Sequence, residues 1–232
     1  MSMRSLTEKE KNDLITLYKD VDHFQKELRD IVSRGFAIEE GIEKGSILFI
    51  SMNPSYRDGA WNNGTKAGNN AIYQIPGLKN AKTPKDTNSF FQVINRFYNE
   101  LNVNKGITPL AHHDLLFIRE TSQETVLNWK KKLDKFNNPF FNDQLNLSKT
   151  IIEDSKPKLI VVLNAGARAL FEQIFQPLDE TLFDDNLGAY LYQIGGKDTP
   201  VPVLFSGMLS GQRAIDLGSR RSLRWHIEYI LK

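Results

Sequence analysis

Residues 47–56 read ILFISMNPSY, an apolar run that ends abruptly at a polar turn. The residues from Ile47 to Ile50 show no alternation of apolar and polar side chains, which is typical of a short strand buried on both faces. Pro54 lacks a backbone N–H and biases Asn53 away from helical geometry, so the chain turns there. The turn holds the Asn53 carboxamide beyond the strand end, where ligands bind in open α/β sheets.

Three more apolar runs predict strands at residues 110–118, 158–163 and 201–205, and the last of these contains Pro202, which favours an edge position. Helical periodicity separates the runs. Strands that alternate with helices predict a three-layer α/β/α sandwich around a four-stranded, mainly parallel sheet. Residues 179–200, with scattered acidic residues and a Gly-rich turn, are interpreted as an insertion.

The expected helices cover residues 8–33, 90–101, 123–134, 140–155 and 166–176, followed by one at the C-terminus. The first begins at a capping box, Thr7 to Glu10, and Gly35 marks its end. We expect residues 1–232 to form one domain, in which residues 1–45 are an N-terminal helical extension and residues 46–232 are the α/β core.

The amino-acid composition excludes several kinds of functional site. Among the 232 residues there is no Cys, which excludes disulfides and a Cys-ligated iron–sulfur cluster, and the four His residues lack zinc-ligand spacing. No metal or other cofactor is therefore expected. The formal charge of +2 neither demands nor excludes a nucleic-acid partner. Because no segment resembles a secretory signal or a membrane span, we expect a soluble, cytoplasmic monomer without a membrane partner.

A long polar stretch, residues 57–87, is rich in Gly, Asn and Lys and is predicted to be a loop. A loop of that length in a compact domain is usually a binding loop or disordered. Trp61 and Tyr73 stand out in it. Each can stack on a base or fasten the loop to the core, and the sequence does not favour either alternative.

The first motif resembles that of the uracil-DNA glycosylase superfamily. Residues 51–55 read SMNPS, and in the mismatch-specific and single-strand-selective branches a strand ends in Gly-x-Asn-Pro-Gly/Ser. Residues 157–170 are similar to the third strand and following helix of that superfamily. Residues 209–213, LSGQR, lie where its last motif is expected, so the resemblance spans roughly residues 46–230.

The resemblance implies excision of a base from DNA. The enzyme would hydrolyse the N-glycosidic bond of a flipped base, uracil or a related deaminated base, in single- or double-stranded DNA. The resemblance assigns catalysis to Asn53, which would position the attacking water, and to Ser210. Contacts with the base or substrate are expected from the motif, the long loop and the ends of neighbouring strands: Ser51, Met52, Pro54, Ser55, Tyr56, Trp61, Tyr73, Arg119 and Asn164.

The last motif also supplies the expected contacts with the DNA strand. Met208 and Leu209 are two apolar residues in a glycine-flanked loop, and they are the expected wedge that fills the space left by the flipped base. Arg213 and Arg220 follow and are expected to contact phosphates.

The sequence departs from the family at two places. The last motif of the family begins with a histidine that contacts the leaving base, and here Phe205 and Ser206 occupy those positions. The pocket asparagine after the second strand is replaced near Arg119, which leaves the identity of the base open. His112 and His113 are expected at the opposite end of their strand from Asn53, and so not to take part in catalysis.

Two other functions compete with a glycosylase. A nucleic-acid-binding module of the same fold that has lost excision would explain the absent histidine. A small-molecule hydrolase that uses the same crevice would act on a nucleoside and would not need the basic residues near Met208.

Overall fold

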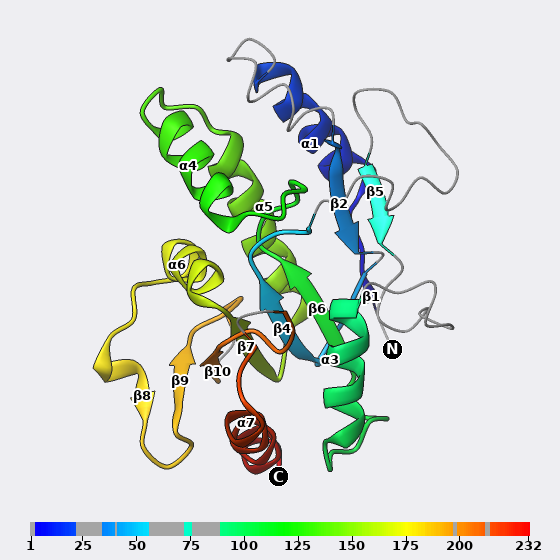
Figure 1. Cartoon of the computed structure of the whole chain (residues 1–232), viewed down its shortest axis with the longest axis vertical. Helices are drawn as coiled ribbons and strands as arrows, with labels where there is room; N and C mark the ends of the chain where they lie inside the picture. The colour runs from blue at the N-terminus through cyan, green and yellow to red at the C-terminus, as the bar shows by residue number, and fades with distance from the viewer. Residues whose placement is uncertain are drawn as a thin grey trace.

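The computed structural model describes residues 3–21, 34–39, 41–55, 72–75, 89–196, 199–211 and 214–232. Within these ranges the chain is an α/β protein, with helices packed on both sides of a mixed six-stranded sheet (Figure 1). None of the helices in these ranges is long and apolar enough to cross a membrane.

The central sheet has the strand order β6-β4-β7-β10-β9-β8. Neighbours among β6, β4, β7 and β10 are parallel, whereas β9 and β8 are added antiparallel. The expectation of four strands is therefore too small by two. In sheet order the strand bounds are β6 (Leu110–Asp114), β4 (Ile47–Ser51), β7 (Leu159–Leu163), β10 (Val201–Ser206), β9 (Ala189–Tyr192) and β8 (Phe183–Asp184).

The two added strands lie in residues 179–200, which the sequence analysis interpreted as an insertion. They form a hairpin, and β9 covers the side of β10 that would otherwise be an open edge. The edge position expected for Pro202 is thus wrong. Proline is tolerated there because the β7 ladder begins only at Val203, so the missing N–H of Pro202 deprives β7 of no partner.

The described helices largely follow the apolar periodicity of the sequence. Thr7 and Glu10 form the expected capping box, since the Glu10 N–H donates to Thr7 Oγ1 at 3.2 Å and the Thr7 N–H to Glu10 Oε2 at 2.8 Å. The first helix is described to Val21, and residues 22–33 of the expected helix lie outside the described residues. The helix bounds are α1 (Glu8–Val21), α3 (Ser89–Glu100), α4 (Gln123–Asp134), α5 (Phe140–Ser155), α6 (Ala165–Ile174) and α7 (Leu217–Ile230), with a short 3₁₀ helix η1 (Glu180–Leu182).

Strand β4 explains why the sheet has helices on both sides. Its side chains alternate between two apolar clusters, and all four residues from Ile47 to Ile50 are fully buried. Ile47 and Phe49 pack with residues of α3 and α7, whereas Leu48 and Ile50 pack with residues of α1, α4, α5 and α6. Each such side chain stabilises the fold by roughly 1.5–3 kcal/mol.

Short strands flank the central sheet. β1 (Met3–Arg4) pairs antiparallel with β3 (Ile42–Glu43), and β2 (Phe36–Glu39) pairs parallel with β5 (Ile72–Ile75). Residues 1–45 therefore contain strands besides the expected helix. β5 lies within residues 57–87, which were expected to be a loop. Its four residues are too few for periodicity to separate from the surrounding polar sequence.

Candidate functional site

The carboxyl ends of three parallel strands meet at one edge of the sheet. Ser51, the last residue of β4, is in register with Asp114, the last residue of β6, and β7 lies on the other side of β4. The SMNPS motif begins at this edge, and the chain that follows β6 runs beside it. We call the end of the sheet that contains Ser51, Asp114 and the end of β7, together with the chain that follows each of these strands, the carboxyl edge. The candidate site was expected there.

The Asn53 carboxamide is held at the carboxyl edge by its nitrogen. Asn53 Nδ2 donates to the carbonyl oxygen of Glu120 at 2.6 Å, to that of Pro54 at 3.0 Å and, more weakly, to that of Ile118 at 3.5 Å. No hydrogen bond from a described residue reaches Oδ1. The side chain is half-buried. The turn therefore fixes the orientation of the amide and leaves its oxygen as a hydrogen-bond acceptor.

The other residues of the motif contribute through the backbone. Met52 is 1% exposed and its side chain belongs to the core, which corrects its expected role as a substrate contact. A Cβ at Gly166 would lie 2.8 Å from Met52 Sδ, so any larger residue there would force the Met52 side chain to move. Pro54 accepts a hydrogen bond from the Glu120 N–H at 3.0 Å, and Ser55 is half-buried.

The turn between β7 and α6 joins the motif to the loop after β10. Asn164 has φ 75° and ψ 161°, a conformation that is almost restricted to glycine. Its Oδ1 accepts from the Ala167 N–H at 2.8 Å and caps α6, and its Nδ2 lies 3.2 Å from Met208 Sδ. The Asn164 N–H donates to the Ser206 carbonyl at 2.8 Å. Residues 164–167 and 206–208 thus form one compact unit.

The loop after β10 does not present the expected pair of wedge residues. Leu209 is 6% exposed and packs in the cluster with α3 and α7, so its side chain is part of the core. Met208 is partly buried and lies against Asn164. Ser210 is also partly buried. Of the two expected wedge residues, Met208 and Leu209, only Met208 therefore has a partly accessible side chain.

Arg220 is engaged away from the carboxyl edge. Its Nη2 lies 3.0 Å from Glu100 Oε1, and its guanidinium lies 5.6 Å from the centre of the Phe97 ring. Glu100 ends α3, and the chain from there leads to the amino end of β6. The expected phosphate contact by Arg220 is therefore not supported by its position.

Arg119 and Glu120 fasten the carboxyl edge to the segment before β2. Arg119 is 3% exposed and donates from Nη1 to the Arg34 carbonyl at 3.1 Å, so it does not face an open site. Glu120 forms an ion pair with Arg34 and accepts from the Ser122 N–H at 2.9 Å, next to the N-cap of α4. This geometry corrects the expected contact between Arg119 and a substrate.

A buried polar cluster lies at the carboxyl edge and includes a histidine, which was not expected there. Ser51 Oγ lies 2.7 Å from His112 Nε2 and is also hydrogen-bonded to Asp114 Oδ1. The rings of Phe90 and Phe91, at the start of α3, lie 5.3 and 5.2 Å from the His112 ring. The prediction that His112 lies at the far end of the strand is wrong, because β6 ends at Asp114 and not at residue 118.

The spacing of the cluster contained a signal that was missed. Residues two apart on a strand share a face, so His112 and Asp114 point to the same side of β6. The apolar run from Leu115 to Ile118 hid the true end of the strand. That run is fully buried but is not a strand. Apolar periodicity does not distinguish a buried strand from a buried segment that is not a strand.

Burial shifts the pKa of each of the two titratable groups next to His112. Burial raises the pKa of Asp114, while the charge of His112 and the hydrogen bond from Ser51 act in the opposite direction. His113 faces the other side of the sheet, where its Nε2 lies 3.0 Å from Ser148 Oγ. Burial, with a smaller contribution from His112, lowers the pKa of His113 to about 3. His113 is therefore neutral near pH 7.

No protein-family model matches this sequence, and no curated protein matches it either. The resemblance to the glycosylase superfamily therefore depends on the motif residues and on their arrangement in the molecule.

Several expected site residues lie outside the described residues. These are Tyr56, Trp61 and Arg213, and for Tyr73 the structure describes the backbone, as part of β5, but not the side chain. Within the described ranges, no three His, Asp or Glu side chains lie close enough together to hold a metal ion. The absence of a cofactor remains a prediction.

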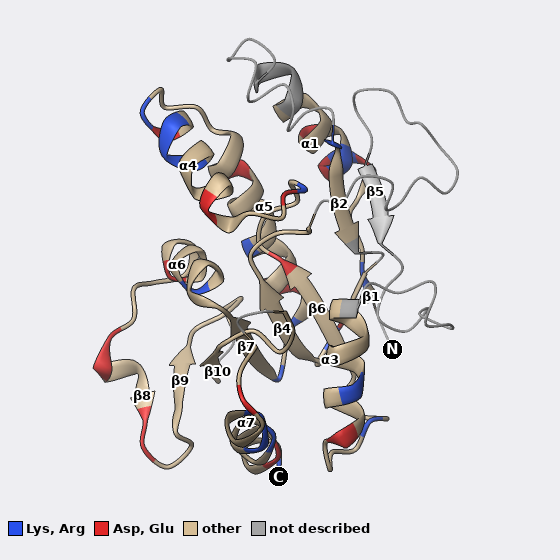
Figure 2. Ribbon diagram, in the orientation of Figure 1, with Lys and Arg blue, Asp and Glu red and all other residues tan. Residues whose placement is uncertain are grey.

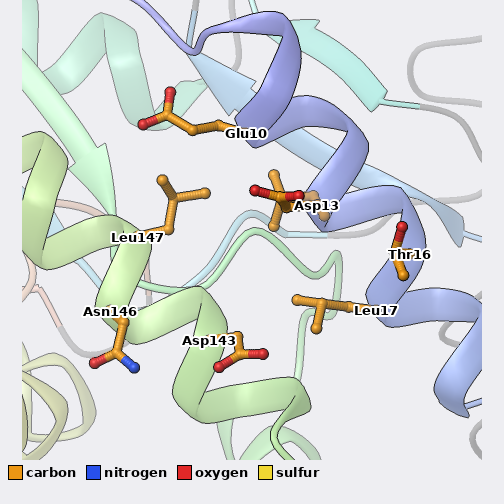
Figure 3. A pocket seen from close by; sticks show the side chains of 8 residues that line it. Glu10, Asp13, Thr16, Leu17, Asp143, Asn146 and Leu147 are labelled. Carbon is orange, nitrogen blue, oxygen red and sulfur yellow. The ribbon is translucent and has the colours of Figure 1, made fainter.

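A pocket of about 410 Å³ lies between α1 and α5, apart from the candidate residues (Figure 3). Glu10 and Asp13 of α1 face Asp143 and Asn146 of α5 across it. Three carboxylates at its walls disfavour a phosphate-bearing ligand. None of the candidate site residues lines it, so this pocket is not part of the carboxyl edge. The residues that line it are Glu10, Asp13, Leu14, Thr16, Leu17, Asp143, Asn146 and Leu147.

Proposed function

We propose that this protein is a base-excision glycosylase with a uracil-DNA glycosylase-like fold. It hydrolyses the N-glycosidic bond of a flipped base, uracil or a related deaminated base, and Asn53 orients the attacking water. The observation that carries the proposal is the anchoring of Asn53 Nδ2 by backbone carbonyls, which turns Oδ1 into a fixed acceptor at the carboxyl edge.

The chemistry of an amide limits what Asn53 contributes. An asparagine side chain does not titrate, so it orients a water molecule without removing its proton. Excision then relies on stabilising a cationic, oxocarbenium-like sugar and the departing base. A fixed acceptor oxygen suits this task, because it holds the water by its hydrogen and places the water oxygen toward the sugar.

The fold gives independent support. The superfamily has a parallel sheet between two helical layers, and this chain has four parallel strands with helices on both faces of the sheet. The β7–α6 turn at Asn164 and the loop at Met208 are in contact. The strand-to-helix turn of the resemblance and the residue that precedes its last motif thus lie side by side, which supports the proposal.

The described residues offer few side chains that could open a DNA duplex. Leu209 is buried and Arg220 is paired with Glu100, so only Met208 remains of the described wedge and phosphate contacts. Figure 2 shows basic residues along α7, and Arg221 on that helix is exposed. These observations favour a single-stranded substrate, whose base needs no displacement from a duplex.

The same observations favour a second candidate function, hydrolysis of a free nucleoside. A nucleoside needs neither a wedge nor phosphate contacts, and the Asn53 chemistry is unchanged. The two functions differ in how the rate depends on phosphate contacts: excision from a polymer falls with increasing salt, whereas hydrolysis of a neutral nucleoside does not.

The test is a single-turnover excision assay with the full chain. Oligonucleotides that contain uracil, hypoxanthine or xanthine, single-stranded and in duplexes, are incubated with the protein, and abasic sites are cleaved with alkali. We expect abasic sites in at least one substrate, formed faster in the single strand, and loss of at least 100-fold in Asn53→Ala, in the range for removal of a positioning group.

Asn146→Ala is the matched control, because it removes the same kind of side chain from α5, where Asn146 lines the pocket that lies apart from the carboxyl edge. It should retain most of the activity. If all oligonucleotides stay intact while uridine, deoxyuridine or inosine is hydrolysed, the nucleoside hydrolase is the correct function. If the protein binds single-stranded DNA and cleaves neither class, it is a binding module.

A further inference from the structure

We propose that Ser51, His112 and Asp114 form a proton-sharing network that delivers a proton through the Ser51 hydroxyl to the departing base. The inference rests on the proposed function and adds an acid to it. In the glycosylase family a histidine of the last motif contacts the leaving base, and here Phe205 and Ser206 occupy those positions. The network would supply a proton at the same edge of the sheet from a different strand.

The hydrogen-bond geometry requires a proton inside the network. Ser51 Oγ is bonded to both His112 Nε2 and Asp114 Oδ1, but a serine hydroxyl has a single hydrogen to donate. It therefore donates to one partner and accepts from the other. Either His112 Nε2 or the Asp114 carboxyl must carry a hydrogen that points at Ser51. Moving that hydrogen from one end to the other requires only a reversal of two hydrogen bonds.

Burial raises the pKa of the carboxyl end of the network, Asp114. His112 is 0% exposed and Asp114 is 7% exposed, so the carboxylate loses most of the hydration that makes it a weak base in water. The imidazolium form of His112 opposes this effect by stabilising the carboxylate. Because a charge on His112 lowers the pKa of Asp114, the protonation of the carboxyl depends on that of the imidazole.

Aromatic rings lie against His112 in the network. From α3 the rings of Phe90 and Phe91 cover His112, and neither ring titrates. The remaining titratable neighbour recorded among the described residues is His113 on β6. It faces Ser148 of α5, and its pKa is about 3. Its neutral ring therefore adds no charge to the network near neutral pH.

The position of Ser51 connects the network to the reaction. Ser51 ends β4 two residues before Asn53, so the hydroxyl that links the two proton holders and the amide that orients the water belong to one turn. Ser51 is 6% exposed and lies at the carboxyl edge. The role proposed for His112 and Asp114 is positioning and proton supply, whereas Ser51 is the member that reaches the base.

The step balances in atoms and charge. The bond between the base nitrogen and the sugar carbon breaks, and its electron pair stays on the base. The base takes the hydrogen of Ser51 Oγ, which is replaced from His112 Nε2 or from the Asp114 carboxyl. Water adds to the sugar carbon and releases a proton, which returns to the network. The products are a protonated free base and an abasic sugar.

The decisive experiment compares two leaving groups. Single-stranded oligonucleotides with uracil or with 5-fluorouracil are used, because fluorine makes the departing base more acidic and less dependent on a proton donor. We expect Ser51→Ala and His112→Gln to slow uracil excision by about 100-fold, at the low end for general acid catalysis. The same variants should slow 5-fluorouracil excision by about tenfold or less.

Ser148→Ala is the matched control. It also removes a buried serine hydroxyl that is bonded to a histidine, but on the other face of the sheet. It should leave the ratio of the two excision rates unchanged. If Ser51→Ala slows both bases equally, or slows neither, delivery of a proton by Ser51 is refuted although the glycosylase function stands.

A readout without excision tests the shared proton itself. In NMR titrations of the full chain, the His112 imidazole nitrogens and the Asp114 carboxyl carbon should shift together in the wild type and separately in Ser51→Ala. Identical titration curves in the two proteins overturn the network. If the wild type excises neither these two bases nor hypoxanthine or xanthine, the proposed function fails together with the delivery step, and the titration alone then decides whether the proton is shared.

Discussion

Asn53 shows how one side chain receives its orientation from the backbone around it. Three carbonyl oxygens, of Pro54, Ile118 and Glu120, face its amide nitrogen. A donor is therefore required on that side, and the oxygen must point the other way. The Ser51 hydroxyl differs from the Asn53 amide nitrogen, which only donates, because it donates one hydrogen bond and accepts another.

Replacing Asn53 with Asp tests the need for a donor. The carboxylate would face carbonyl oxygens and lose the hydrogen bonds that Nδ2 makes, so we expect the free energy of unfolding to fall by about 1–3 kcal/mol. Urea unfolding of the full chain measures it, with Ser55→Ala as the control from the same turn. An Asn53→Asp protein as stable as the wild type would show that the amide orientation is not fixed by these carbonyls.

His113 gives the fold a pH dependence of known sign. In the unfolded chain its pKa is near the ordinary value of ~6.5, and in the folded state the pKa is about 3. Above that ordinary value both states are neutral and His113 has no effect. As the pH falls below it, the unfolded state takes up a proton that the folded state does not, so stability is lost by up to about 1.4 kcal/mol per pH unit.

The variant His113→Gln isolates this contribution. The difference in the free energy of unfolding between wild type and His113→Gln should grow with pH from about 3 to ~6.5 and then become constant. Asp114 acts in the opposite direction, because a raised pKa gives stability at low pH that is lost as the pH rises. Since Asp114 is present in both proteins, its effect cancels from the difference. Parallel stability curves would contradict the burial of a neutral His113.

At the scale of elements, the turn from β7 into α6 contains a residue in a strained backbone conformation. Asn164 occupies a region of φ and ψ that costs other residues of order 1–3 kcal/mol. The residue compensates in part, because its side chain caps α6 and contacts Met208. Strain that is held in place by such contacts is common at functional sites.

Asn164→Gly should therefore raise the free energy of unfolding by about 1 kcal/mol, since glycine relieves the strain and loses only a few tenths as an N-cap. Asn164→Ala keeps the strain and loses the cap, so it should lower the free energy of unfolding by about 1 kcal/mol. Thermal or urea unfolding of both variants measures this. The idea of a strained turn is wrong if the glycine variant is the less stable of the two.

At the scale of the whole molecule, Arg34 and the first residues of β2 are tied to the carboxyl edge. Phe36 forms a bridge with Ile118, and the Ala37 N–H donates to the Phe117 carbonyl at 2.8 Å. Arg34 adds an ion pair with Glu120, whose backbone oxygen holds Asn53. The N-terminal part of the chain thus supports the residue on which the proposed chemistry depends.

A double-mutant cycle measures that support. We expect a coupling energy of about 1 kcal/mol between Arg34→Gln and Glu120→Gln, because both side chains are mostly buried. The control is the pair Lys130–Asp134 at 2.7 Å within α4, for which about 0.3–0.5 kcal/mol is expected. Equal coupling in the two pairs would mean that the Arg34–Glu120 pair contributes no more than an ordinary surface ion pair.

Much of the element order was predictable because it depends on local patterns. The apolar run at Ile47, the capping box at Thr7 and the periodicity of residues 123–134 and 140–155 led to the observed elements. Prediction failed where a short segment obtains its conformation from a distant partner. β9 is a strand because β10 lies beside it, and β6 ends early because residues 115–118 are buried without forming a strand.

Some features of the candidate site could likewise be predicted from local sequence, and others could not. The sequence alone determined that a carboxamide follows a buried strand at Asn53, because proline, an apolar run and a polar turn are adjacent in the chain. Only the tertiary structure decided that His112 meets Ser51 and that Leu209 belongs to the core. Those contacts join residues far apart in the chain, and they depend on strand register and on the packing of both faces, which no local pattern encodes.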